Sequence, residues 1–287
     1  MRHEAELVIK NKSYKMEKVN PIIEEVVNRY KTIQNYTSMF TNGNESAIRG
    51  LLISGDAGFG KTHFTKLGLG HVNPEMIDYV KGSSISAAAL YVKLFMNRFA
   101  GQVLILDDVD IINKTKAEFA LIIEMLKGAT EPTKGERTLA WSRAQRNQLM
   151  VENDVPDSFD FNGTIIWITN ERVRDIAEKC GSHWNALDSR FYKVEAWLND
   201  QEKLMYTLYL VEDIDMLGKE CYAKEGGYSK NVIEKATKYL RDNYKYMYDF
   251  NSNSTLSPRS AVKLADTITN FADDWKMMAN MQFIKIK

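Results

Sequence analysis

The chain has little cysteine, and what it has favours neither a disulfide scaffold nor a metal site. Only Cys180 and Cys221 occur among 287 residues, which indicates a reducing compartment rather than a disulfide-stabilised secreted fold. Cys180 and His183 have the spacing of two zinc ligands, but no second pair of ligand residues lies nearby, so a zinc site has little support. No internal repeat and no low-complexity segment is present.

An excess of one charge and long apolar runs are missing as well. Lys+Arg and Asp+Glu both number 38, so no overall basic field attracts nucleic acid, although a local patch is compatible with this balance. The longest apolar runs, GLLI, VLIL and TIIWI, have the length of strands and cannot span a bilayer. The opening MRHEAELVIKNKSYK lacks the apolar core of a signal peptide. We therefore expect a soluble cytoplasmic protein without a membrane partner.

Short apolar runs in the middle of the chain predict an α/β fold. The runs LLIS, MIDYV, VLILDD and TIIWITN alternate with helical stretches. Buried parallel strands have this pattern, and helices between them imply a sheet covered on both faces. The residues before this region are polar with helical spacing, and strand signals stop after it. We expect an N-terminal helical segment (1–47), an α/β domain (48–198) and a helical domain (199–287).

The last domain is expected to contain three helices. The first covers 200–227 and is ended by Gly226 and Gly227, and the second covers 231–248. The third covers 257–275, with Ser257 as N-cap and Pro258 in the first helical position.

A glycine-rich loop after the first apolar run predicts a phosphate site. GDAGFGKTHF fits the pattern G-x-x-x-x-G-K-[ST], with a strand before it and a helix after it. Glycines let backbone N–H groups turn toward an anion, and the helix N-terminus adds its positive end. Lys61 would reach the β- and γ-phosphates of ATP, and the Thr62 hydroxyl would bind Mg²⁺. The expected nucleotide-binding residues are Gly55, Asp56, Ala57, Gly58, Phe59, Gly60, Lys61, Thr62 and His63. The alternative is a glycine turn with a surface lysine.

Polar side chains at the ends of two later runs complete a candidate catalytic site. Asp107, after VLIL, is expected in the shell of the metal, and Asp108 beside it would polarise the attacking water. Asp110 is a further carboxylate with a weaker claim. Asn170, after TIIWIT, could orient the same water, although an Asn in this place is often a turn residue.

These segments together resemble those of an AAA+ ATPase. GDAGFGKT is similar to Walker A, VLILDD to Walker B and IIWITN to the sensor 1 strand. NALDSRF resembles the segment with the arginine finger, and LSPRSAVKLA resembles sensor 2 in a helical lid. The resemblance covers about 48–270 and implies a P-loop NTPase sandwich around a five-stranded parallel sheet, with a C-terminal helical lid.

The resemblance also implies roles for arginines and an assembly. Arg190 would be the finger that reaches a neighbouring subunit's ATP, with Arg172 and Arg174 as competitors, and Arg259 would touch nucleotide from the lid. The alternatives are a structural salt bridge for Arg190 and a surface charge for Arg259. The active form would be a homo-oligomeric ring or filament, typically a hexamer.

Two segments are candidates for contact with a substrate. YVKGSSIS (79–86) lies where AAA+ rings often have a pore loop. TEPTKGERTLAWSRAQRNQ interleaves Trp141 with basic residues, which suits a nucleic-acid backbone and a stacked base. The alternative is a solvated hairpin whose tryptophan packs on the sheet. The basic residues are Lys134, Arg137, Arg143 and Arg146.

The predicted function is an ATPase coupled to nucleic acid, in replication, recombination or helicase loading, with DNA or a DNA-bound protein as partner. Asp108 stands where most AAA+ proteins have Glu, and this Asp-Asp form is seen in replication initiators and helicase loaders. A protein remodeller would want an aromatic pore loop, which KGSSIS lacks. A P-loop kinase of small molecules needs neither Asn170 nor a finger such as Arg190. The general look of the chain resembles small phage-encoded AAA+ ATPases, which would place it in the host cytoplasm.

Overall fold

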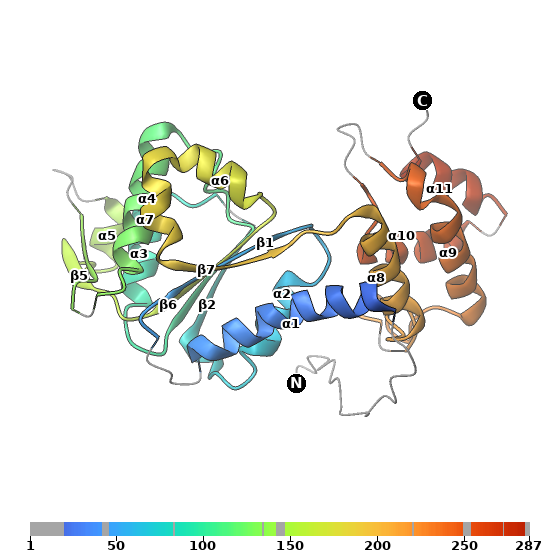
Figure 1. Ribbon diagram of the computed structural model, residues 1–287, viewed down its shortest axis with the longest axis horizontal. Helices are drawn as coiled ribbons and strands as arrows, with labels where there is room; N and C mark the ends of the chain where they lie inside the picture. Colours follow the sequence, from blue (N-terminus) through green and yellow to red (C-terminus); the bar gives the residue numbers. More distant parts are fainter. Residues whose placement is uncertain are drawn as a thin grey trace. The chain divides into compact units, whose positions relative to one another are not determined.

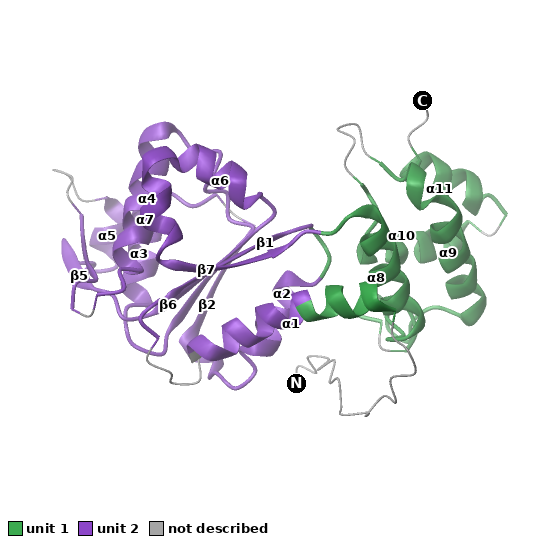
Figure 2. Cartoon of the chain, viewed as in Figure 1, with its two compact units in different colours: residues 1–28, 57–59, 198–287 green, residues 29–56, 60–197 purple. Residues whose placement is uncertain are grey.

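The chain divides into two compact units, which Figure 2 colours separately. The structure, a computed structural model, describes residues 20–41, 46–82, 84–133, 135–141, 147–219, 221–248, 254–271 and 273–284. Unit 1 contains residues up to 28, 57–59 and 198–287, and unit 2 contains 29–56 and 60–197. The domain boundaries expected after residues 47 and 198 stay a prediction.

A five-stranded sheet is the centre of unit 2. Its strands lie in the order β2-β3-β6-β1-β7, and each neighbouring pair is parallel. The four apolar runs of the sequence form β1, β2, β3 and β6, and every residue of β1, β3 and β6 is buried. The strands are β1 (Gly50–Gly55), β2 (Ile77–Lys81), β3 (Val103–Asp107), β6 (Thr164–Thr169) and β7 (Phe191–Ala196).

The fifth strand, β7, comes from a segment without a continuous apolar run. In FYKVEA, Phe191, Val194 and Ala196 are buried, whereas Lys193 and Glu195 are exposed. An edge strand has a more accessible face, so it shows alternation where the inner strands are apolar throughout.

Helices cover both faces of the sheet. Figure 1 shows α3, α4 and α7 on one face and α2 on the other, where Tyr30 of α1 stacks on Phe64 of α2 at 5.6 Å between ring centroids. Hydroxyl caps fix where α3 and α4 begin, since Ser86 and Thr115 accept the backbone N–H of Ala89 and Glu118. The bounds are α1 (Pro21–Thr41), α2 (Lys61–Gly68), α3 (Ala87–Met96), α4 (Lys116–Ala129), α5 (Gln148–Glu152), α6 (Val173–Cys180) and α7 (Trp184–Asp188).

A small two-stranded antiparallel sheet lies outside the main sheet. Its strands are β4 (Thr138–Ala140) and β5 (Ser158–Asp160). Short 3-10 turns complete unit 2 at Pro74–Met76 and Gly181–His183.

Unit 1 is helical, with its own apolar core. Its helices α8 (Asp200–Glu212), α9 (Lys230–Asn243), α10 (Pro258–Asn270) and α11 (Trp275–Phe283), and the 3-10 turn Tyr244–Tyr246, enclose buried residues such as Leu217, Leu240 and Leu264. Ser257 caps α10 in a reciprocal pair with Ser260, and Pro258 occupies the first turn, which confirms the predicted start. The helix expected over 257–275 ends at Asn270, and the separate helix α11 was not predicted. In the described part of the chain, no helix combines the length and apolarity needed to cross a membrane.

The helix expected to reach Gly227 ends much earlier, so that prediction was wrong. After Glu212 the chain turns, with the N–H of Met216 donating to Leu210 O and Asp215 in a left-handed conformation at φ 59°. This turn carries Leu217 into the helical core, where it is fully buried. Burial of this leucine outweighs further extension of a helix whose next residues are polar.

Candidate nucleotide site

The loop after β1 has the backbone of an anion cradle. Gly58 and Gly60 have φ of 83° and 108°, a region that side chains with a Cβ rarely adopt. Gly60 is the N-cap of α2, which begins at Lys61, so the first N–H groups of the helix face the loop. Glycine is therefore required here by conformation, as the phosphate-loop prediction assumed.

Lys61 is held inside this loop by all three of its donors. Lys61 is buried, with 6% of its surface exposed. Nζ donates to Gly55 O at 2.8 Å, to Asp56 O at 2.9 Å and to Asn170 Oδ1 at 2.7 Å. The ammonium group thus joins the loop after β1 to the end of β6.

Asp107 and Thr62 meet as expected for a metal site. Thr62 Oγ1 donates to Asp107 Oδ2 at 2.9 Å, and Asp107 is 2% exposed. A hydroxyl and a carboxylate are hard oxygen ligands, which fit Mg²⁺ when phosphates and waters supply the remaining positions. Across the described ranges, no group of three or more His, Cys, Asp or Glu could hold a metal alone. This donor set fits a metal that arrives with nucleotide.

A tyrosine that sequence reasoning missed also contacts Asp107. Tyr79 of β2 donates its hydroxyl to Asp107 Oδ2 at 3.0 Å. Burial, and then the negative charge of Asp107, raise the pKa of Tyr79 well above its usual value, so the phenol stays protonated and remains a donor. No local sequence pattern marks this contact, because it depends on β2 lying next to β3 in the sheet.

Asp108 and Asn170 form the second half of the site. Asp108 has φ 51°, an uncommon conformation for a residue other than glycine, although Asp tolerates it better than most. Its Oδ1 accepts a hydrogen bond of 2.7 Å from Asn170 Nδ2. Asn170 therefore links Lys61 to Asp108, with its oxygen on the lysine and its amide on the carboxylate.

The sheet explains why residues so distant in sequence meet. β1, β3 and β6 are parallel neighbours or next neighbours, so their carboxyl ends share one edge.

Two further candidate residues lie near these side chains in the sequence. His63 follows the lysine and threonine on α2. Burial, with a smaller contribution from Lys66, lowers the pKa of His63, which keeps the imidazole neutral near pH 7. Asp110 lies in the loop after β3, where its carboxylate accepts hydrogen bonds from the backbone N–H and the Nδ2 of Asn113.

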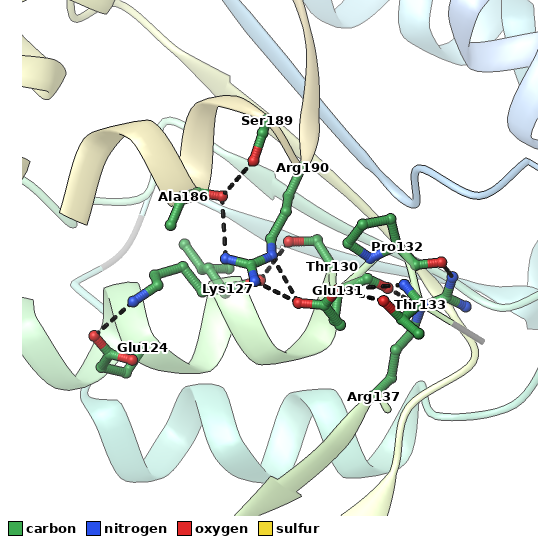
Figure 3. A network of polar contacts seen from close by, with 11 residues as sticks. Glu124, Lys127, Thr130, Glu131, Pro132, Thr133, Arg137, Ala186, Ser189 and Arg190 are labelled. Carbon is green, nitrogen blue, oxygen red and sulfur yellow. Dashed lines mark hydrogen bonds and ion pairs between the residues drawn. The ribbon is translucent and has the colours of Figure 1, made fainter. Parts of the chain in front are cut away.

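Arg190 is engaged within its own chain. Its Nε donates to Glu131 Oε2 at 3.1 Å, its Nη2 forms an ion pair with the same oxygen, and Nη1 donates to Ala186 O at 3.1 Å (Figure 3). Thr133 donates to the other oxygen of Glu131. The pKa of Glu131 is lowered, and the main cause is the hydrogen bond from the Arg190 guanidinium. The pair fastens the end of α4 to the start of β7.

The competing arginines, Arg172 and Arg174, are both exposed but differ in their contacts. Arg172 lies over the ring of Trp197, 4.3 Å from its centroid. The side chain of Arg174 is 78% exposed and makes only long ion pairs, at 3.6 Å to Asp175 and 3.8 Å to Glu178. Arg259 belongs to unit 1 and is exposed; a Cβ built on Gly58 of the same unit would lie 3.3 Å from its Cδ.

The described part of the basic segment is structural. Arg137 is 9% exposed and donates to the carbonyl oxygens of Glu131, Pro132 and Ala47 (Figure 3). Trp141 is equally buried and contacts Tyr91 at 5.4 Å between ring centroids. The buried Trp141 agrees with the alternative in which the tryptophan packs, whereas Arg137 is buried and not solvated as that alternative assumed. Lys134, Arg143 and Arg146 lie outside the described residues.

The segment 79–86 is tied to the loop after β3. Gly82 N donates to Asp107 O at 2.8 Å, and Ser84 pairs with Asp110 in an isolated bridge and accepts a hydrogen bond from Lys114. Ser83 lies outside the described residues. The segment is thus attached to the loop with Asp107 and Asp108.

A comparison with curated proteins gives a phage relative. The chain is 32% identical over 273 residues to an uncharacterised 36.7 kDa protein of the nrdC-mobD intergenic region of Enterobacteria phage T4, a match that covers 92% of this chain and 78% of the relative. The chain belongs to the family of this phage protein. The likeness to small phage-encoded proteins, expected from the sequence, agrees with this relative. No protein-family model matches the chain.

Solved structures with a similar fold come from Thermotoga maritima. The RuvB Holliday junction branch migration motor is 16% identical, with a TM-score of 0.44, and the match covers 90% of this chain and 68% of that one. Domain III of the replication initiation protein DnaA is 12% identical, with a TM-score of 0.45, and the match covers 94% and 100%. At these identities and TM-scores, neither likeness bears on substrate, partner or reaction.

The predicted fold class is confirmed by the chain's own topology. A five-stranded parallel sheet has β1 between β6 and β7, the glycine loop follows β1, the paired aspartates end β3 and Asn170 follows β6. A helical unit comes after the sheet along the chain. This is the arrangement that the resemblance to an AAA+ P-loop ATPase implies.

Proposed function

We propose that the chain binds ATP with Mg²⁺ at the loop after β1 and hydrolyses it. The observation that carries this proposal is the continuous polar network of Lys61, Asn170 and Asp108 beside the Thr62–Asp107 pair. A glycine turn with a solvated surface lysine would not require a buried ammonium group bonded to the end of another strand. The network instead supplies a cation, metal ligands and a water-orienting pair at one edge of the sheet.

Each residue has a task in that reaction. The N–H groups of the loop and of the first turn of α2 would bind phosphate oxygens, and Lys61 would exchange its carbonyl contacts for the β- and γ-phosphates. Thr62 and Asp107 would hold Mg²⁺, which when bound would neutralise part of the negative charge of the phosphates. Departure of Lys61 from Asn170 would leave the amide and Asp108 to hold the attacking water between them.

We also propose that the site is completed by a neighbouring copy of the chain. Arg190 would serve as the finger after leaving Glu131, and Arg259 would respond to nucleotide within its own subunit. Arg172 and Arg174 remain the competitors for the finger role, because both are exposed and the ion pairs of Arg174 are long. Such a site requires a ring or filament, and a hexamer is the form that the family resemblance implies.

The work coupled to hydrolysis is proposed to involve nucleic acid. The Asp107–Asp108 pair, a form seen in replication initiators and helicase loaders, supports this, and so does the basic segment that contains Arg143 and Arg146. Arg137 and Trp141 no longer contribute to this argument, since both are used in packing. DNA or a DNA-bound protein remains the proposed partner.

The experiment is ATP hydrolysis per subunit against protein concentration, with and without single-stranded DNA. We expect the rate per subunit to rise with concentration, because assembly completes the sites, and to increase again with DNA. Charge reversal at Arg143 and Arg146 should reduce the DNA response and its salt dependence without affecting the basal rate.

Other outcomes would favour other functions. A rate of ATP hydrolysis per subunit that depends on neither protein concentration nor DNA would contradict the coupling to nucleic acid and favour a protein remodeller. ATP consumption that requires a small-molecule acceptor would favour a kinase.

A further inference from the structure

Tyr79 is directed at Asp107 by the register of the sheet. β2 and β3 are parallel, with Tyr79 opposite Ile105 and Lys81 opposite Asp107. Ile105 and Asp107 are two residues apart and share a face, so Tyr79 lies on the face that carries Asp107. The ring is close to α2, since Lys66 Nζ lies 5.6 Å from its centroid. A long side chain at this position reaches the metal carboxylate along the strand direction.

The two hydroxyl groups that contact Asp107 use the same oxygen. Thr62 Oγ1 and Tyr79 OH donate to Oδ2 at 2.9 and 3.0 Å, and within the described part of the chain no hydrogen bond reaches Oδ1. Asp107 is 2% exposed, so water has little access with which to satisfy or reorient it. Two donors on one oxygen fix the rotation of the carboxylate more firmly than Thr62 alone could.

We propose that Tyr79 is a positioning residue for the metal site, which keeps Asp107 oriented with Oδ1 available to the metal and its waters. This role rests on the proposed function, because it concerns the same nucleotide site. Groups that orient a metal ligand from behind affect metal affinity strongly, often by tenfold or more. Tyr79 touches neither phosphate nor water in this proposal and acts only through Asp107.

The test is Tyr79→Phe in the full chain, which keeps the ring and removes the hydroxyl. Two quantities are measured: the affinity for a fluorescent ADP analogue with Mg²⁺ and with EDTA, and the Mg²⁺ concentration that gives half-maximal ATP hydrolysis. We expect roughly tenfold more Mg²⁺ to be needed, with analogue binding in EDTA unchanged. The rate lost at low Mg²⁺ should be recovered as Mg²⁺ is raised.

Tyr228→Phe is the matched control. Tyr228 also donates to an aspartate, Asp266 Oδ1, at 2.7 Å, but this part-buried bond joins the segment before α9 to α10 within unit 1. The control should leave the Mg²⁺ dependence at the wild-type value, whatever small loss of thermal stability either variant shows.

Three results would overturn the proposal. An unchanged Mg²⁺ requirement in Tyr79→Phe would mean that the hydroxyl does not position Asp107. Equal weakening of analogue binding in Mg²⁺ and in EDTA would assign Tyr79 a general structural role instead. If the wild-type chain bound the analogue no better with Mg²⁺ than with EDTA, the proposed function itself would fall, and the metal role of Tyr79 with it.

Discussion

Replacing Lys61 by alanine should abolish ATP hydrolysis and weaken ATP binding by roughly a hundredfold or more, given the strength of charge-assisted bonds to phosphate. The ammonium group is buried and bonded to two carbonyl oxygens of the loop and to Asn170 Oδ1, and the stretch GDAGFG contains no other cation that could take its place. Phosphate release and equilibrium binding of a fluorescent ATP analogue measure the two effects.

A matched control separates this loss from a general effect of removing a lysine. Lys116 is exposed in the first turn of α4, and Lys116→Ala should hydrolyse ATP at the wild-type rate. Both variants should keep the melting temperature of the wild type within a few degrees, because a change of about 1 kcal/mol moves Tm by only a few degrees at this size. Near-normal hydrolysis by a folded Lys61→Ala protein would remove the basis for a phosphate loop.

The second large effect is expected for Arg190. Arg190→Ala should bind ATP but hydrolyse it slower by about a thousandfold, the scale of a lost arginine finger. Mixing it with Asp108→Asn should restore part of the activity, because a mixed interface can join an intact Asp108 to an intact Arg190. The measurement is the rate of the mixture against the rates of each variant alone, with co-assembly checked by mass.

The ion pair between Arg190 and Glu131 allows a second test of this prediction. If Arg190 must leave Glu131 to reach a neighbour's nucleotide, Glu131→Gln should keep or raise hydrolysis, since it loosens the pair. If Arg190 only fastens α4 to β7, Glu131→Gln and Arg190→Ala should each lose about 1–3 kcal/mol of stability and show no rescue in mixtures. If a mixture of Arg174→Ala and Asp108→Asn regained activity, and a mixture of Arg190→Ala and Asp108→Asn did not, Arg174 would be the finger.

The sequence was most informative where chemistry and strand pattern coincide. Gly60, Lys61 and Thr62 were recognisable because the loop lies between an apolar run and a helix. Asp107 and Asn170 could be expected near them, because parallel strands bring their carboxyl ends to one edge. The fully buried strands were visible for the same reason, as continuous apolar runs without polar alternation.

What the sequence did not reveal depends on tertiary contacts. Strand β7 alternates because it lies at an edge, so its pattern carries no long apolar run. The end of α8 depends on burial of Leu217, which only the packed helical unit decides. Tyr79 looks like any strand tyrosine until the β2–β3 register is known. Glu131 is separated from Arg190 by 59 residues, and no local pattern connects the two.

The most direct test of the account is one comparison of ATP hydrolysis between the wild type and Asp108→Asn, at a concentration where both assemble. Asp108 is expected to polarise the attacking water, so its amide replacement should bind the ATP analogue with wild-type affinity and release phosphate at a small fraction of the wild-type rate. Retention of bound, unhydrolysed ATP by Asp108→Asn would support a hydrolytic site built on Lys61, Asn170 and Asp108. Phosphate release by the variant at the wild-type rate, or no hydrolysis by the wild type itself, would contradict the account.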